Sequence, residues 1–152
     1  MSEQNKALIR RWIEEVQKGN LDVMDEVLAS DFVDHSLLPG QRPDREGYKQ
    51  GLSEDRNAFH NVKITVEDQI AEGDKVMTRY RWRGTHNRGR FRDVPPTGRE
   101  IEATAIVVHR IVGGKVKEEW SASDTLETLR QLGAVPEGGT AGGNQPGLTT
   151  DQ

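Results

Sequence analysis

The chain contains no cysteine, which excludes disulfides, thiolate metal sites and a cysteine nucleophile. Its four histidines are scattered without the spacing of a metal site, so no metal is expected. Aromatic residues make up 5% of the sequence, and no apolar run approaches the roughly 20 residues that a membrane span needs. The opening segment, MSEQNKALIRRW, also lacks the apolar core of a signal peptide. We therefore expect a soluble, cytoplasmic protein with no membrane partner.

Other missing features narrow the range of functions. The formal net charge is −4, so no overall positive field favours binding to nucleic acid. No glycine-rich phosphate loop follows a predicted strand, and no Gly-x-Ser-x-Gly elbow of a serine hydrolase is present. The sequence therefore gives no signal for a nucleotide cofactor or for a serine nucleophile.

Three helices are predicted in the first part of the chain. The first runs from residue 2 to about residue 18 and ends at Gly19, and Asn20 caps a short second helix. The third is expected over about 45–58 with Asp44 as its cap. The first helix carries one apolar stripe, formed by Leu8, Ile9, Trp12, Ile13 and Val16.

Beyond residue 61 the pattern alternates with a period of two, which predicts strands. Four antiparallel strands are expected, over about 62–67, 76–83, 101–111 and 116–124, before a short helix over 125–132. The fold class is thus α+β: a cone-shaped barrel in which the N-terminal helices pack on a curved antiparallel sheet. A single domain is predicted over residues 1–136, and the sequence 137–152, with one leucine and no aromatic residue, predicts a flexible tail.

The two strands between Ile101 and Asp124 are the best candidates for the wall of a pocket. On the first, the odd positions share the more apolar face, and this face includes His109. On the second, strict alternation predicts one inward face that is formed by Val116, Glu118, Trp120, Ala122 and Asp124. A face that mixes small and aromatic residues with histidine and carboxylates is typical of a ligand pocket.

With these elements placed, the chain resembles the SnoaL-like polyketide cyclase family of the nuclear-transport-factor-2-like fold. The resemblance covers about residues 5–134. The phrases that carry it are Lys6-Ala7-Leu8-Ile9-Arg10-Arg11-Trp12, Phe32-Val33-Asp34-His35, Arg83-Gly84-Thr85-His86, Pro95-Pro96-Thr97-Gly98-Arg99 and Leu129-Arg130-Gln131-Leu132-Gly133.

The resemblance implies cofactor-independent acid/base chemistry in a hydrophobic cone, in which a polyketide ring closes by intramolecular aldol addition. It implies Asp124 as the catalytic acid/base and His35 as a pocket histidine. The inward position of His109 makes it a further catalytic candidate. The substrate would be a hydrophobic, carbonyl-bearing small molecule bound by Trp12, Tyr80 and Trp120. A homodimer formed through the outer face of the sheet is also implied.

Other interpretations of the same residues stay open. Asp124 precedes Thr125 and has Glu127 three residues later, a pattern close to that of a helix N-cap. His109 is also compatible with a core histidine whose hydrogen bonds are satisfied. An apolar Val107, where family members often carry a polar group, favours a binding or scaffold module without chemistry.

Arginines suggest two further alternatives. A water-activating, epoxide-hydrolase-like site needs an arginine that faces inward between two acids. The alternation of Arg79, Arg81 and Arg83 points them outward instead, towards salt-bridge partners such as Glu67. Arg88, Arg90 and Arg92 lie on a polar loop and could meet an acidic group at a pocket rim.

Overall fold

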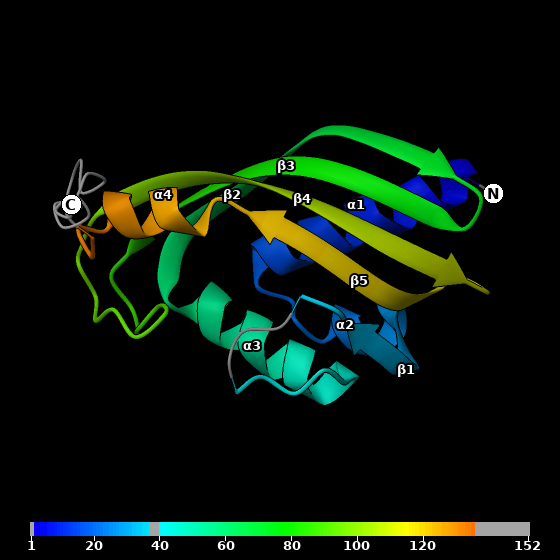
Figure 1. Cartoon of the computed structure of the whole chain (residues 1–152), viewed down its shortest axis with the longest axis horizontal. Coiled ribbons are helices and arrows are strands. Elements are labelled where there is room, and N and C mark those ends of the chain that lie inside the picture. Colours follow the sequence, from blue (N-terminus) through cyan, green and yellow to red (C-terminus); the bar gives the residue numbers. More distant parts are fainter. Residues whose placement is uncertain (1, 37–39, 136–152) are drawn as a thin grey trace, which may run out of the picture.

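The computed structural model describes residues 2–36 and 40–135, and its centre is a curved sheet of five strands (Figure 1). The strand order is β1-β5-β4-β3-β2. The pairs β2–β3, β3–β4 and β4–β5 are antiparallel, and β1 joins β5 in parallel at one edge. The strands are β1 (Leu28–Asp34), β2 (Phe59–Glu72), β3 (Lys75–His86), β4 (Glu100–Val112) and β5 (Lys115–Ser123).

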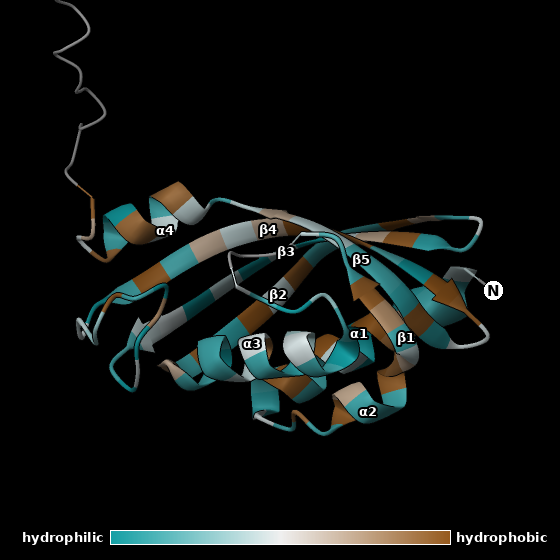
Figure 2. Cartoon of the chain, turned by 60° about the horizontal axis from the view of Figure 1, so that its bottom comes forward, coloured by the Kyte–Doolittle hydropathy of each residue, from teal (hydrophilic) through white to brown (hydrophobic). Residues whose placement is uncertain are grey.

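Three helices lie on the same side of this sheet, and a fourth follows β5 at the far end (Figure 2). They are α1 (Ser2–Lys18), α2 (Val23–Val27), α3 (Arg45–Asn57) and α4 (Thr125–Gln131). The apolar stripe of α1 turns Ile9, Trp12 and Val16 into the core, as the spacing predicts. Gly19 ends α1 with a φ of 91°, which a glycine adopts without steric cost.

The predicted α+β architecture is confirmed, with two differences in its elements. The segment before His35 belongs to the sheet as β1, whereas the sequence indicated only a short extended segment. The short helix α2 begins at Val23 after Asp22, later than the predicted cap at Asn20. The N-cap of α3 is as predicted, because the Asp44 carboxylate accepts a hydrogen bond from the amide of Gly47 at 2.9 Å.

The hydrophobic core is divided between two ends of the cone. The larger cluster joins α1, α2 and β1 to the sheet, and it includes Ile9, Trp12, Phe32, Ile111 and Val116. The smaller cluster lies under the far end of the sheet and consists of Ala58, Phe59, Phe91, Ile101 and Leu132. Between them the concave face of the sheet is not filled by side chains, and this is where the cavities lie.

A β-bulge in β5 changes which of its side chains face inward. Ile111 pairs with Val116 and Arg110 pairs with Glu118, so Lys117 is an extra residue in β5. Beyond the bulge Glu119 lies opposite the inward-facing His109.

The prediction that Glu118 and Trp120 face inward is therefore wrong. Trp120 lies opposite Val108 on the outer face of the sheet, and Arg110 lies opposite Glu118 on that same face. The predicted alternation is confirmed on β4, where the buried positions are Ile101, Ala103, Ala105, Val107, His109 and Ile111.

The outward direction predicted for the arginines of β3 is confirmed. Arg81 forms an ion pair with Glu67 at 2.7 Å, and Arg79 forms one with Asp68 at 3.1 Å. No helix within the described ranges is long and apolar enough to cross a membrane. The tail predicted over 137–152 lies outside the described residues.

Candidate active site

The main interior cavity has a volume of about 650 Å³ and lies between the concave face of the sheet and α3. Asp34, Tyr48, Tyr80, Val107 and Glu119 are among the residues that line it. A smaller and more apolar cavity of about 180 Å³ shares part of this lining, including Leu52, Tyr80 and Ala105, and continues to Phe59, Trp82 and Phe91. A polar chamber thus adjoins an apolar one, which suits a hydrophobic ligand with a few polar groups.

Glu119 is the best placed carboxylate in this cavity. It lies beyond the bulge in β5, opposite the inward-facing His109, and only 5% of its surface is exposed. Its Oε1 atom accepts one hydrogen bond from the hydroxyl of Tyr48 at 3.0 Å and one from Nε2 of His109 at 2.7 Å. Both partners fix the carboxylate from the core side while the residue still lines the cavity.

Tyr48 supports Glu119 as a neutral hydrogen-bond donor. Burial raises the pKa of the Tyr48 phenol well above its ordinary value, and the negative charge of Glu119 acts in the same direction. The hydroxyl therefore keeps its proton at neutral pH. The ring also packs edge-on against Phe32 with centroids 5.2 Å apart, which restricts its orientation.

His109 lies behind Glu119 in the core. It is 2% exposed, and its ring lies 5.1 Å from that of Trp12. Its Nδ1 atom has no hydrogen-bond partner among residues 2–36 and 40–135. A nitrogen that bonds a carboxylate oxygen carries the proton, so we assign His109 the tautomer with hydrogen on Nε2. His109 can therefore act on a ligand only through Glu119.

Asp34 is a second buried carboxyl group on the cavity wall, 5% exposed at the end of β1. Its oxygens accept hydrogen bonds from the amide of Ser36 at 2.9 Å and from Nε2 of Gln41 at 3.0 Å. Burial raises the pKa of Asp34, and the charge of Glu119 raises it further. The hydrogen bonds from Ser36 and Gln41 act in the opposite direction, and the net effect is a raised pKa for Asp34. Two acidic groups with different environments thus share the cavity.

The sequence-predicted binding residues lie in three different places. Tyr80 lines both cavities, and burial raises the pKa of its phenol, so it is neutral there. Trp12 is a core residue that packs against Tyr48 and His109. Trp120 lies on the outer face of the sheet, so a place for it in the cavity wall is contradicted by the bulge.

His35 also lies outside the cavity, because alternation along β1 turns Asp34 in and His35 out, as predicted for this pair. Its ring stacks on that of Trp120 with centroids 4.8 Å apart and planes 11° apart. Its Nε2 atom contacts the carboxylate of Glu118 at 2.8 Å. A direct contact between His35 and a ligand in the cavity is therefore not possible in this arrangement.

Asp124 has the position of a helix N-cap, the alternative interpretation of its sequence context. Its side chain is exposed and accepts a hydrogen bond from the amide of Glu127 at 3.1 Å. The neighbouring residues Ser123 and Thr125 line the cavity, whereas the Asp124 carboxylate is directed at the start of α4. A catalytic role for Asp124 stays a prediction that this position does not support.

Three site residues were missed by sequence reasoning: Asp34, Tyr48 and Glu119. A signal existed for Asp34, because alternation places it on the same side as the apolar Phe32. Tyr48 was predicted as an inward residue of α3, without a functional role. Glu119 could not be found by alternation, since the bulge reverses the phase of the strand just before it.

The donor atoms in the cavity are suited to proton transfer. Carboxyl, phenol and imidazole groups that touch one another can exchange protons within hydrogen-bond distance. Within the described ranges, no group of three or more histidine, aspartate and glutamate side chains is arranged to hold a metal ion.

Comparison with known families identifies the family of this chain. A family profile described as SnoaL-like polyketide cyclase matches residues 7–132, most of the chain. The chain belongs to the SnoaL-like polyketide cyclase family. SnoaL-like cyclases bind small hydrophobic substrates, in agreement with the apolar part of the cavity.

Individual SnoaL-like relatives agree with the family assignment. The chain is 28% identical to an aklanonic acid methyl ester cyclase of Streptomyces peucetius over 137 residues, covering 86% of this chain and 94% of that protein. It is also 28% identical to the nogalonic acid methyl ester cyclase of Streptomyces nogalater over 116 residues, covering 76% and 87% of the two chains.

Solved structures show the same fold. IdmH of Streptomyces antibioticus superposes with a TM-score of 0.74 at 34% identity, covering 86% of this chain and 99% of that chain. TsrD of Streptomyces laurentii reaches a TM-score of 0.80 at 22% identity, covering 89% and 98%. At that lower identity TsrD is similar in fold alone.

Proposed function

We propose that this SnoaL-like protein closes a ring by a cofactor-independent, intramolecular aldol addition in a hydrophobic substrate with two carbonyl groups. The observation that supports this most directly is the pair of buried carboxyl groups on one cavity wall. Glu119 is held by Tyr48 and His109, and burial raises the pKa of Asp34 above that of an exposed aspartate. The two relatives described above are named as cyclases of aklanonic and nogalonic acid methyl esters, and the cavity has room for a small molecule of that kind.

The reaction needs one proton removed and one delivered. Glu119, as the carboxylate, takes a proton from the carbon beside one carbonyl group, and the resulting enolate carbon attacks the second carbonyl carbon. A C–C bond forms, and the second carbonyl oxygen, now an alkoxide, takes the proton of Asp34. A proton passed from Glu119 to Asp34 restores the starting state. No electrons enter or leave, so no redox partner is required.

Substitution of Glu119 tests the proposed base. The variant Glu119→Gln keeps the size and hydrogen-bonding capacity of the side chain but cannot take a proton. We expect cyclisation to fall by about 10²–10⁴-fold, the usual contribution of a general base, with a nearly unchanged melting temperature. Turnover would be measured on aklanonic and nogalonic acid methyl esters and on the corresponding free acids.

Glu118→Gln is the matched control for this experiment. Glu118 is the adjacent carboxylate in the sequence, but it lies on the outer face and contacts His35 and Arg110. Its substitution should leave cyclisation within about twofold of the wild-type rate, because the change lies outside the cavity. Full activity in Glu119→Gln, or an equal loss in both variants, would refute the role of Glu119.

We also infer that the protein forms a homodimer through the outer face of the sheet. An apolar row crosses four strands there, because Ile70 pairs with Met77, Met77 with Val108 and Val108 with Trp120. Ile106, on the same face of β4, is 45% exposed, and Ile70 is 61% exposed. A contiguous apolar patch of this kind supports association between two copies.

A further inference from the structure

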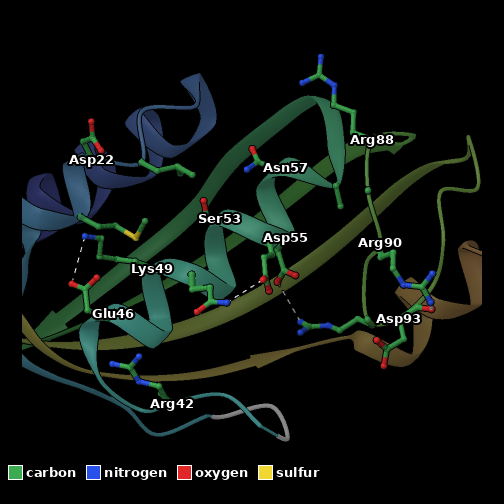
Figure 3. Close-up of a pocket in the computed structure, with 17 residues that line it drawn as sticks. Asp22, Arg42, Glu46, Lys49, Ser53, Asp55, Asn57, Arg88, Arg90 and Asp93 are labelled. Carbon is green, nitrogen blue, oxygen red and sulfur yellow. Dashed lines mark hydrogen bonds and ion pairs between the residues drawn. The ribbon is translucent and has the colours of Figure 1, made fainter.

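Arg92 occupies a junction between all the large cavities described for this protein. Its side chain lines the main cavity, the smaller apolar cavity and an open groove of about 1230 Å³ between α3 and the loop over residues 87–99. Figure 3 shows this groove, with Asp55 on α3 directed towards the loop that carries Arg90 and Asp93. A cation at this point is adjacent both to solvent and to the proposed reaction chamber.

The loop holds Arg92 in place through a tight turn. Phe91 and Val94 exchange two backbone hydrogen bonds of 2.9 and 2.8 Å, so Arg92 and Asp93 are the two central residues. Both have positive φ angles, 51° and 67°, as a type I′ turn requires, although this turn usually contains asparagine or glycine. The buried Phe91 ring anchors the turn against Phe59. Strained backbone of this kind is often found where a side chain serves a ligand.

The charge of Arg92 is poorly matched by the protein itself. Its ion-pair partner in the described part of the chain is Asp55, at 3.8 Å from Nη2, which is too long for a hydrogen bond. The Nε atom is buried and has no hydrogen-bond partner among the described residues. Arg81, by comparison, lies 2.7 Å from Glu67 on the outer face.

Asp55 is also a weak counter-charge. Burial raises its pKa, and the nearby Arg92 only partly offsets that effect. A guanidinium group that forms no hydrogen bond with the described residues, and whose nearest carboxylate lies 3.8 Å away, is a suitable site for an anion from outside the chain. The ring of Phe91, 4.9 Å from the guanidinium carbon, holds the cation in place without supplying a hydrogen-bond acceptor.

We propose that Arg92 binds a free carboxylate of the substrate, so that this SnoaL-like protein acts on polyketide acids in preference to their methyl esters. The proposal deepens the proposed function and rests on it for the identity of the reaction. It separates this chain from the relatives named as methyl ester cyclases, since a methyl ester has no charge for Arg92 to bind. The acid group would lie at the junction of the cavities while the hydrophobic rings occupy the interior.

The test compares two ligands that differ only in this group, anthraquinone-2-carboxylate and its methyl ester, with binding measured by titration calorimetry. We expect the wild-type protein to bind the acid at least about tenfold more tightly than the ester, the usual contribution of a charge-assisted hydrogen bond. Arg92→Gln should lose about tenfold for the acid and less than twofold for the ester. Asp55→Asn should bind the acid as tightly as the wild type or more tightly, because it removes a competing carboxylate.

Arg88→Gln is the matched control, because Arg88 is an exposed arginine of the same loop that lines only the outer groove. It should bind both ligands like the wild type. The proposal is overturned if the wild-type protein does not bind the acid or does not distinguish the two ligands. It is also overturned if Arg92→Gln weakens both ligands equally, or if Arg88→Gln weakens the acid as much as Arg92→Gln does.

Two further measurements keep the test decisive. If Arg92→Gln melts at a lower temperature, Arg92→Lys, which retains the charge, should keep part of the preference for the acid. In the wild type, added salt should weaken binding of the acid and leave that of the ester unchanged. Binding is measured without turnover, so an active Glu119→Gln variant would refute the proposed function and leave the carboxylate site standing. An Arg92→Gln variant that binds the acid as tightly as the wild type would refute the carboxylate site and leave the proposed function standing.

Discussion

The buried Asp34 responds to pH in the opposite sense from an exposed, ion-paired carboxylate such as Asp25, whose pKa is lowered by its contact with Lys49. Asp34 titrates near 3.8 in the unfolded chain, and burial raises its pKa in the folded state. The folded protein therefore holds this proton to a higher pH than the unfolded chain does. The stability that Asp34 contributes is fully present below the unfolded pKa and is lost as pH rises through the raised folded pKa.

Asp34→Asn should consequently be more stable than the wild type at pH 7. The amide cannot ionise, and Gln41 can turn its own amide to keep a hydrogen bond with it. The difference should shrink as pH falls from 7 to 4 and should vanish only below 3.8, where the wild-type carboxyl group is protonated in both states. Urea unfolding of the two proteins at pH 7 and pH 4 measures this. A stability difference that does not change with pH would contradict the raised pKa.

Substitutions of Asp124 separate the cap from the predicted catalyst. Asp124→Ala removes the acceptor for the amide of Glu127 and should cost about 1 kcal/mol, or roughly 2–5 °C in melting temperature. Asp124→Asn keeps a good cap and should change stability by only a few tenths of a kcal/mol. Both variants should retain cyclisation. Loss of turnover in Asp124→Asn at an unchanged melting temperature would restore the catalytic prediction.

At the scale of single elements, the first turn of α3 packs closely against the segment 40–44, which borders the cavity. Gly47 lies against the backbone of Arg42, and a Cβ atom added there would come closer than 3.0 Å to that segment. The same segment carries Gln41, which holds Asp34. The glycine therefore keeps the 40–44 segment close enough to α3 for this hydrogen bond to form.

Gly47→Ala should destabilise the protein by about 1–3 kcal/mol, the cost of overpacking at a site with no free space. Gly51→Ala, one helical turn later, is the control, since the nearest atoms to a Cβ there are 3.9 Å away in the Gln41 side chain. Alanine favours helix over glycine, so this variant should gain up to about 1 kcal/mol. Thermal unfolding of both variants checks the pair, and the same sign in both would contradict the close contact.

Local patterns predicted most elements, because their causes lie within a few residues of the sequence. The stripe of α1, the Asp44 cap of α3 and the inward face of β4 all follow from short-range spacing. The inward position of Glu119 does not, because it depends on how β5 is paired with its neighbours. Nothing in the sequence from Lys115 to Ser123 shows that the strand will contain a bulge, with Lys117 as an extra residue between the partners of Ile111 and Arg110.

At the scale of the whole molecule, the two faces of the sheet differ in what they carry. The concave face holds the cavities, and the outer face carries the apolar row that we expect to join two copies. His35, Trp120 and Glu118 form a cluster on that outer face, and the His35 contact lowers the pKa of Glu118. His35 and Trp120, expected from the sequence to serve the pocket, instead lie on the face that we expect to join two copies.

Ile106→Glu should convert the expected dimer to a monomer, because it places a charge next to the apolar row. Ala7→Glu adds the same charge to an exposed position of α1, on the opposite side of the sheet, and should leave the dimer intact. Sedimentation velocity of the wild type and both variants gives the oligomeric state directly. A monomeric wild type, or dissociation by Ala7→Glu as well, would count against the outer-face interface.

The bulge at Lys117 also has a consequence for engineering of the strand. Without this residue, Glu118 would still pair with Arg110 and Glu119 with His109, now in ordinary alternation. Deletion of Lys117 should therefore leave Glu119 facing the cavity. Its cost should fall on the edge of the sheet, because Lys117 forms an ion pair with Asp31 of β1 at 2.6 Å.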